Sequence, residues 1–409
     1  MQEISRDSIW KSILSLPVLV AALGYLVDMY DLFLFSVVRV PSLKALGVSQ
    51  EDLLPVGVSI LNWQLIGLLI GGIIWGIMGD KKGRLSVLFG SIIMYSLANF
   101  ANGFVQTVPQ YAVLRFIAGI GLAGELGAGI TLVAELLPQR LRSYGAVIVS
   151  TMGVFGGILA FLVADIFEWR TSYFAGGFMG MALLFLRIRV FESGLFLNLK
   201  EKKITRGDMM IILTNGKRLL KYIMGILVGI PMWFVVGVLM TFSPEFGIAH
   251  GIEGINAGKG VMLLFGGQAF GNMVSGFLSQ YLKSRKAGIG IFMIGSFLTM
   301  LAYMLLPLST AFQFYLIIFI LGFFNGYWTL FIIQAAELFG TNIRATVATT
   351  IPNFVRGTAI IFTTAFAGLR PSLGVINGGV LLACIAVFIG LGALFLLQET
   401  YHKDMNYEE

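Results

Sequence analysis

The chain has 409 residues, of which 57% are hydrophobic and only 12% are charged, and its formal net charge at neutral pH is +7. Soluble domains carry roughly 25% charged residues, so this composition excludes a water-soluble globule, which would lack polar surface. Repeated apolar stretches of about 20 residues or more indicate a helical protein that crosses a membrane many times. A transmembrane β-barrel would instead show alternating segments of roughly ten residues, and the sequence has none.

The rarer residue types narrow the chemistry. A single cysteine, Cys384, excludes an internal disulfide and a cysteine-based metal site. The two histidines, His250 and His402, fall in a loop and in the tail, so they form no cluster. We therefore expect no metal and no cofactor. We also expect a monomer in the lipid bilayer that binds a small molecule and no nucleic acid.

Hydropathy predicts twelve transmembrane helices. They cover residues 13–38, 58–78, 85–104, 109–134, 144–166, 172–190, 219–242, 258–280, 287–306, 312–338, 345–368 and 373–396. Residues 191–218 read as a cytoplasmic linker whose end, LTNGKRLLK, is either an interfacial helix or a solvated loop. The prediction is an all-α integral membrane protein with six-helix bundles at 1–190 and 219–409, the second ending in a short tail.

The distribution of basic residues predicts the orientation. Of the 28 Lys and Arg residues, 21 fall on the side of the N-terminus, 5 on the other side and 2 within spans. Lys and Arg are enriched in cytoplasmic loops. We therefore expect both termini in the cytoplasm of a bacterial-type cell, with the protein in the inner membrane.

An internal repeat supports the division into two bundles. The stretch AELLPQRLRS begins at Ala134 and AELFGTNIRA begins at Ala336, an offset of 202 residues. Each stretch ends one predicted helix and begins the next. Parallel repeats of this kind are one of the two repeat plans of secondary transporters.

The loop after the second span reads GIMGDKKGR, from Gly76 through Asp80 and Gly83 to Arg84. It resembles the signature between helices two and three of the major facilitator superfamily. The resemblance implies a transporter with two pseudo-symmetric six-helix bundles, in which this loop forms a gate latch. The alternative is a charged turn that obeys the positive-inside rule. Leu282 stands where the repeat would place the aspartate, which predicts an asymmetric latch.

The offset of 202 residues also aligns Glu135 with Glu337 and Arg142 with Arg344. These pairs resemble the cytoplasmic charge clusters of the same superfamily. In each pair the carboxylate lies about two helical turns from its arginine. We interpret them as structural latches that take part in gating rather than as substrate ligands.

Two spans resemble particular branches of the superfamily. Span four reads LRFIAGIGLAGELGAGI and resembles the metabolite:proton symporters, which carry organic acids and zwitterions. Span one contains DMYD at Asp28–Asp31 and resembles the aromatic-acid and sialic-acid proton symporters, although Met29 replaces their usual glycine. Span five lacks the Gly-Pro of the drug-antiporter signature, which disfavours drug export.

Four charged residues within the apolar spans are candidates for proton coupling: Asp28, Asp31, Arg115 and Glu125. A charge at the bilayer centre costs about 2.5 kcal/mol or more, so these groups must face a cavity or a partner. Asp31 and Arg115 lie at matched depth, roughly 10 and 9 Å from the outer ends of their helices. We expect Arg115 to pair with Asp31, Asp28 or both. The pair either couples proton entry to movement or braces the helices statically.

Arg356 is the leading candidate for the substrate site. It lies near mid-membrane, and the second half offers no acidic partner at that depth. Guanidinium groups bind carboxylates in a fork, so the carboxylate of a substrate is the expected partner. A snorkelling or carbonyl-bonded arginine, or one paired with a distant aspartate, is the alternative. Polar and aromatic groups at similar depth complete the predicted site: Tyr30, Trp233, Gln268, Asn272, Asn325, Tyr327 and Trp328.

These observations predict a proton-coupled symporter of a small organic acid or zwitterionic metabolite that works by alternating access. The alternative is a proton-antiport exporter of a metabolite, siderophore or drug. A membrane enzyme or a transport-dead receptor would belong to a third class. The spans contain no histidine and the chain has no P-loop, so we expect neither an enzyme nor ATP-driven transport.

Overall fold

The computed structural model describes residues 15–137, 142–188, 209–340 and 344–401. Within these ranges all regular secondary structure is helical, as the composition predicts. The helices before the gap at 189–208 are called the N-half below, and those after it the C-half. The helices of the N-half are α2 (Leu16–Ala45), α3 (Leu53–Lys82), α4 (Arg84–Asn102), α5 (Val108–Leu122), α6 (Glu125–Leu136), α7 (Arg142–Ile166) and α8 (Trp169–Arg187).

The C-half contains the remaining elements. They are α10 (Met209–Leu213), α11 (Gly216–Phe234), the π-helix η1 (Val235–Met240), α12 (Ser243–Ala249), α13 (Ala257–Leu282), α14 (Arg285–Leu305), α15 (Ala311–Phe324), α16 (Trp328–Glu337) and α17 (Arg344–Leu396). The side chain of Asn215 accepts hydrogen bonds from the amides of Lys217 and Arg218 and so caps α11. The end of the expected linker is therefore the first turn of a membrane helix.

The described residues include ten helices that are long and apolar enough to cross a membrane. One of them, Thr350–Leu396, has 47 residues and is interrupted at Gly374, where φ is 73° and ψ is 178°. It is long enough for two crossings of about 20 residues each. The less apolar α8 packs against α4 and α2 inside the bundle. Nine single spans, two from Thr350–Leu396 and one from α8 together give the twelve expected spans.

The helices differ from the predicted spans in two respects. α2 continues seven residues beyond the predicted end at 38, to Ala45, and contains Pro41 in its last turns. Spans four and ten are each interrupted, because α5 ends at Leu122 and α15 ends at Phe324. These two ends are separated by 202 residues, the offset of the sequence repeat. Hydropathy does not reveal such breaks because the chain stays apolar across them.

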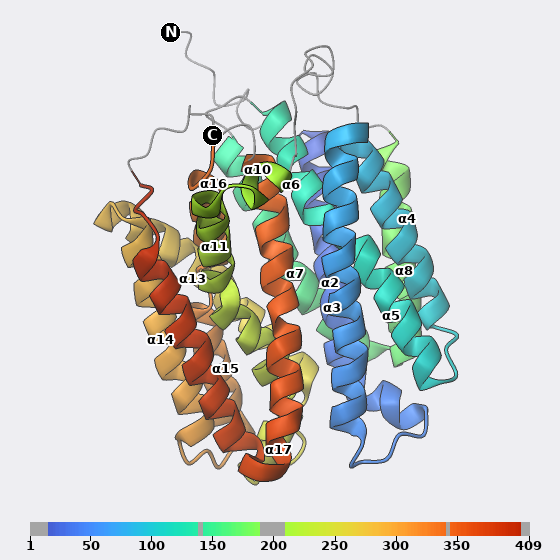
Figure 1. Ribbon diagram of the computed structural model, residues 1–409. Coiled ribbons are helices and arrows are strands. Elements are labelled where there is room, and N and C mark those ends of the chain that lie inside the picture. Colours follow the sequence, from blue (N-terminus) through green and yellow to red (C-terminus); the bar gives the residue numbers. More distant parts are fainter. Residues whose placement is uncertain (1–14, 138–141, 189–208, 341–343, 402–409) are drawn as a thin grey trace.

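The helices run side by side and form one bundle, in which α3 and α17 bring the N-half and the C-half together (Figure 1). α7 and α13 make the second large contact between the halves. α2 begins and α17 ends at the upper end of the bundle in Figure 1, which we call the termini end. The α2–α3 connection lies at the opposite end. The interior between the halves holds the candidate site.

Glycines permit the closest helix contacts, as the high glycine content predicts. A Cβ atom on Gly119 of α5 would overlap the backbone of Gln64 in α3, so these two helices approach each other more closely than a side chain allows. Gly83 ends α3 with φ 98°, a conformation that favours glycine. The tight turn expected in the GIMGDKKGR loop is therefore present.

Candidate substrate cavity and buried ion pairs

A small cavity of about 20 Å³ lies between the two halves at the centre of the bundle. It has room for roughly one water molecule. Its walls combine aromatic and aliphatic side chains with four polar ones, those of Ser150, Gln268, Asn325 and Arg356. The N-half contributes Tyr25, Met29, Phe33, Ser150 and Val154, and the C-half contributes Met232, Trp233, Val236, Phe265, Gln268, Asn325, Trp328 and Arg356. Of the eight predicted substrate residues, five line this cavity.

The polar groups of the cavity retain unused hydrogen-bonding capacity. Arg356 is fully buried, and its Nε and Nη1 atoms have no hydrogen-bond partner. Its Nη2 makes only long contacts, 3.4 Å to the Tyr25 hydroxyl and 3.7 Å to the Met29 sulfur. The side-chain oxygens of Gln268 and Asn325 are also buried without a partner. Buried polar groups are normally hydrogen-bonded, so these atoms are available to hydrogen-bond a ligand.

The other three predicted substrate residues lie outside the cavity wall. The Tyr30 hydroxyl donates to the carbonyl of Ser172 at 2.7 Å, inside the N-half. The side chain of Asn272 accepts from the amide of Thr329 at 3.3 Å, near the break between α15 and α16. Tyr327 is fully buried in that break, and its hydroxyl has no partner. Depth along a helix did not distinguish these residues from the cavity-lining ones.

Asp31 and Arg115 form a buried ion pair within the N-half. Arg115 Nη1 donates to Asp31 Oδ1 at 2.9 Å, and both side chains are fully buried. Arg115 Nη2 donates to the Asn99 side chain at 2.5 Å, and its guanidinium lies over the Tyr173 ring. The structure thus brings together the two residues placed at matched depth by the sequence. Neither residue lines the central cavity.

Asp28 and Arg356 face each other across the boundary between the halves. Arg356 Nη1 lies 3.8 Å from Asp28 Oδ2, too far for a hydrogen bond. Both oxygens of Asp28 are buried and lack hydrogen-bond partners. The sequence predicted that Arg115 pairs with Asp31, Asp28 or both, and it offered no acidic partner for Arg356 in the C-half. In the structure, the acidic side chain nearest to Arg356 is that of Asp28 in the N-half. This agrees with the alternative interpretation, in which Arg356 pairs with a distant aspartate.

Glu125 has a partner that the sequence analysis missed. Arg187 donates from Nη1 and Nη2 to the two carboxylate oxygens of Glu125, at 2.7 and 2.6 Å. The Ser91 hydroxyl adds a third hydrogen bond at 3.1 Å. Arg187 was not among the two basic residues expected within spans, because it lies near the end of the predicted span 172–190; in the structure it is the last residue of α8, and its side chain is 99% buried. One available signal was Gly24, whose missing side chain leaves space for this pair.

A second missed arginine joins the two halves at the opposite end. Arg39 had been counted with the outer loops, yet its side chain is fully buried. It forms an ion pair with Glu245 of α12 at 2.7 Å. Nearby, the hydroxyls of Ser36 and Thr241 lie 3.0 Å apart, also across the halves. The extension of α2 beyond residue 38 carries Arg39 to this position.

The predicted latch residues are described only in part. Glu337 forms an ion pair with Arg285 at 3.2 Å and accepts a hydrogen bond from Thr400 at 2.7 Å. A Cβ atom on Gly76 would meet open space. The side chains of five other residues lie outside the described part of the structure: Asp80, Arg84, Glu135, Arg142 and Arg344. Their roles in gating stay predictions.

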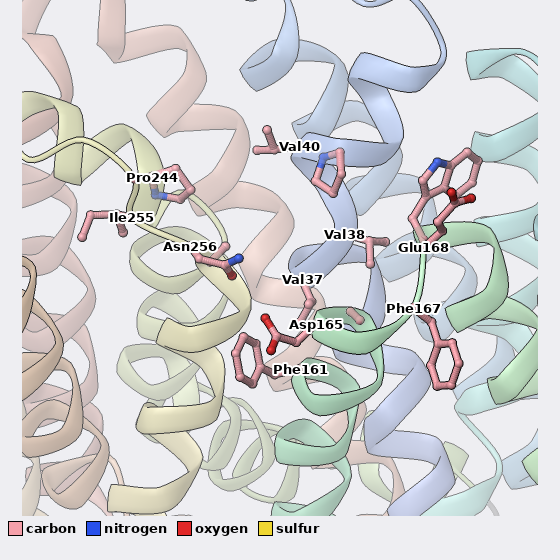
Figure 2. A pocket seen from close by; sticks show the side chains of 15 residues that line it. Val37, Val38, Val40, Phe161, Asp165, Phe167, Glu168, Pro244, Ile255 and Asn256 are labelled. Carbon is pink, nitrogen blue, oxygen red and sulfur yellow. The ribbon is translucent and has the colours of Figure 1, made fainter.

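A larger cavity of about 420 Å³ lies at the opposite end, between α2, the end of α7 and the segment before α13. Figure 2 shows Val37, Phe161, Asp165 and Asn256 among the side chains that line it. On its side toward the termini end, Phe265 of α13 packs against Gly157 of α7 and separates this larger cavity from the central one. The central cavity is therefore closed toward this end.

Buried ion pairs near a cavity between two helical halves are typical of membrane transporters. The sequence model of the Major Facilitator Superfamily matches residues 21–364, and the chain belongs to that family. The protein is thus a multi-pass membrane transporter and not an enzyme, as the sequence predicts.

Two curated relatives and one solved structure illustrate the similarity. A putative metabolite transport protein of Haemophilus influenzae is 26% identical and covers 97% of this chain and 98% of its own length. The sialic acid transporter NanX of Escherichia coli is 31% identical over 42% of this chain and 43% of its own length. The proton:xylose symporter XylE superimposes with a TM-score of 0.74 at 18% identity, covering 98% of both chains. The last comparison shows the fold alone.

Proposed function

We propose that the protein is a proton-coupled symporter that carries a small organic acid or zwitterionic metabolite by alternating access. One observation carries this proposal: Arg356 offers two unbonded guanidinium nitrogens at the wall of an aromatic cavity between the two halves. An arginine in this state favours a carboxylate ligand because a guanidinium donates to both carboxylate oxygens.

The rest of the cavity supports a small acid with an apolar body. Phe33, Trp233, Phe265 and Trp328 line the cavity together with Arg356, whose guanidinium lies over the Trp233 ring. Small-molecule sites typically combine such apolar walls with a few placed polar groups. The relative NanX is a transporter of sialic acid, which also carries a carboxylate. The present cavity of about 20 Å³ must widen before any such substrate can enter.

Coupling to protons is supported by three carboxylates buried in the interior of the N-half. Asp28, Asp31 and Glu125 are buried within the N-half, where a charge is tolerated only beside a partner. A movement of the halves that changes these partners changes the affinity of a carboxylate for a proton. A proton gradient can therefore drive the movement.

The orientation follows from the positive-inside rule. The termini end carries the basic loops, so we assign it to the cytoplasm of a bacterial-type inner membrane. In this orientation the larger cavity of about 420 Å³ and the Arg39–Glu245 pair lie toward the outside of the cell. We assign the working unit to a single chain, because one chain encloses the whole cavity.

Uptake into proteoliposomes tests the proposal. Benzoate, nicotinate and sialic acid are suitable labelled probes because each presents one carboxylate on a compact ring. We expect at least one of them to accumulate when the outside is made acidic, and Arg356→Gln to abolish this uptake in a protein that still folds. Loss of a preloaded probe under the same gradient would indicate the antiport exporter instead. Absence of transport for all three would overturn the proposed substrate class.

A further inference from the structure

The buried charges of the interior balance only across the two halves. Three carboxylates lie buried in the N-half: Asp28, Asp31 and Glu125. Two arginines of the same half, Arg115 and Arg187, hydrogen-bond Asp31 and Glu125. Among the described residues, the third carboxylate, Asp28, has its nearest counter-charge in Arg356 of the C-half. Asp28 therefore depends on the other half for neutralisation.

The three pairs also differ in geometry. The hydrogen bonds of the Asp31 and Glu125 pairs are 2.6–2.9 Å long, and polar neighbours such as Asn99 and Ser91 hold these pairs in place. The Asp28–Arg356 pair is 3.8 Å apart, and neither Asp28 oxygen has a hydrogen bond. Of the three carboxylates, Asp28 is held least tightly and is the one that faces the substrate arginine.

We propose that the substrate carboxylate replaces Asp28 as the counter-ion of Arg356, and that Asp28 then takes up the coupled proton. The inference rests on the proposed function and assigns the coupling to one of its three candidate carboxyls. A monovalent substrate would otherwise leave one uncompensated negative charge in the interior. One proton from water, bound as an O–H bond on an Asp28 oxygen, restores neutrality, and its loss accompanies substrate release.

The surroundings of Asp28 support this exchange. Asp28 is 12 residues from the start of α2, and Arg356 is 12 residues from the start of α17, so both lie roughly 18 Å from the termini end. The other charged groups whose fields reach Asp28 are Glu125 and Asp31, which oppose a negative charge on Asp28, and Arg187, whose weaker field favours one. The Tyr25 and Tyr95 hydroxyls are the neutral titratable neighbours. Without Arg356, the nearby carboxylates favour a neutral Asp28.

Proton counting on ligand binding tests the assignment. Purified protein is titrated with benzoate, nicotinate or sialic acid, and the protons taken up are measured calorimetrically in buffers of different ionisation enthalpy. We expect the native protein to take up about one proton per bound probe. Asp28→Asn should bind the probe with no proton uptake, whereas Asp31→Asn should retain that uptake. Proton uptake that persists in Asp28→Asn would overturn the proposal.

A second measurement needs no ligand, so it separates this inference from the proposed function. Removing the Arg356 guanidinium deprives Asp28 of its counter-ion, as the bound substrate carboxylate would. Infrared spectroscopy of Arg356→Gln at neutral pH should show the carbonyl band of a protonated carboxylic acid, absent from the native protein and absent again from Asp28→Asn/Arg356→Gln. An Arg356→Gln spectrum without this band, in a variant with cooperative thermal unfolding, would refute the exchange. If the band appears but no probe is transported, only the proposed function fails.

Discussion

Arg39 and Glu245 connect the two halves at the end opposite the termini. Arg39 Nη2 donates to both carboxylate oxygens of Glu245, at 2.7 and 2.8 Å. Arg39 also donates to the carbonyls of Leu53 and Thr241, and its guanidinium lies over the Phe242 ring. Because α2 and α12 belong to different halves, this pair must break when the bundle opens at this end. We therefore expect it to act as a latch on the closed state.

The latch predicts a shift in conformation when Glu245 is neutralised. Glu245→Gln leaves Arg39 without its counter-charge, and breaking such a buried pair costs about 3–5 kcal/mol. The equilibrium should move toward the state that opens at this end. A cysteine placed at Val37, which is 9% exposed beside Gly258 in the C-half, should react faster with a membrane-impermeant thiol reagent in a Cys384→Ala background. Equal rates in Glu245→Gln and in the exposed control Glu253→Gln would contradict this role.

A second prediction concerns the Glu125–Arg187 pair. Arg187→Gln removes the guanidinium and leaves the Glu125 carboxylate buried without a counter-charge, so the free energy of unfolding should fall by about 3–5 kcal/mol. The double variant Glu125→Gln/Arg187→Gln should recover part of that loss, because it leaves no lone charge. Thermal unfolding of the four proteins in detergent measures this cycle. Strict additivity of the two single changes would mean that the residues do not interact.

Gly24→Ala tests the same pair from the neighbouring helix. A Cβ atom at this position would lie 2.8 Å from Glu125 Oε2 and closer still to Arg187 Nη2. The pair must move to accept the methyl group, so a loss of thermal stability is expected in Gly24→Ala. Gly76→Ala is the matched control, because a Cβ atom there meets open space in a described helix. A similar small effect of both substitutions would show that the pair can shift without cost.

These pairs show what the sequence could and could not predict. Hydropathy located the spans because the bilayer requires long apolar helices, and the depth of Asp31 and Arg115 placed them together correctly. Depth does not reveal which side of a helix faces which neighbour. Arg39 lies just beyond the predicted span 13–38, and Arg187 lies near the end of the span 172–190. Depth alone therefore did not identify them as buried. The Asp28–Arg356 relationship joins different halves of the chain, where no local pattern connects the two residues.

The C-terminal segment predicts a pH dependence of stability. The Glu399 carboxylate accepts hydrogen bonds from the Ser284 hydroxyl and from the amides of Arg285 and Lys286, at the start of α14. Partial burial raises the pKa of Glu399, but its hydrogen bonds to Ser284 and to backbone amides outweigh this, so the pKa lies below the ordinary glutamate value. A carboxylate at a helix N-terminus is also favoured by the helix dipole.

The sign of this effect follows from proton linkage. A lowered pKa in the folded state means that the unfolded state binds more protons, so the contribution is complete above the ordinary glutamate pKa of about 4.3 and is lost as the pH falls through the folded value. Glu399→Gln should therefore lower the thermal midpoint at neutral pH, and the difference from the native protein should shrink in acid. A difference independent of pH would show that packing, not charge, is lost. The exposed Glu51→Gln serves as the control.

The last prediction concerns selectivity within the central cavity. The Gln268 side-chain oxygen is buried at the cavity wall without a partner, so it can accept a hydrogen bond from a donor on the substrate. 4-Hydroxybenzoate differs from benzoate by one such donor, and a neutral hydrogen bond contributes about 0.5–1.5 kcal/mol. Gln268→Leu should therefore reduce the preference for 4-hydroxybenzoate over benzoate by about 2- to 13-fold, while the carboxylate still binds Arg356. Competition between the two acids for labelled benzoate uptake measures this ratio, and an unchanged ratio would place the hydroxyl away from Gln268.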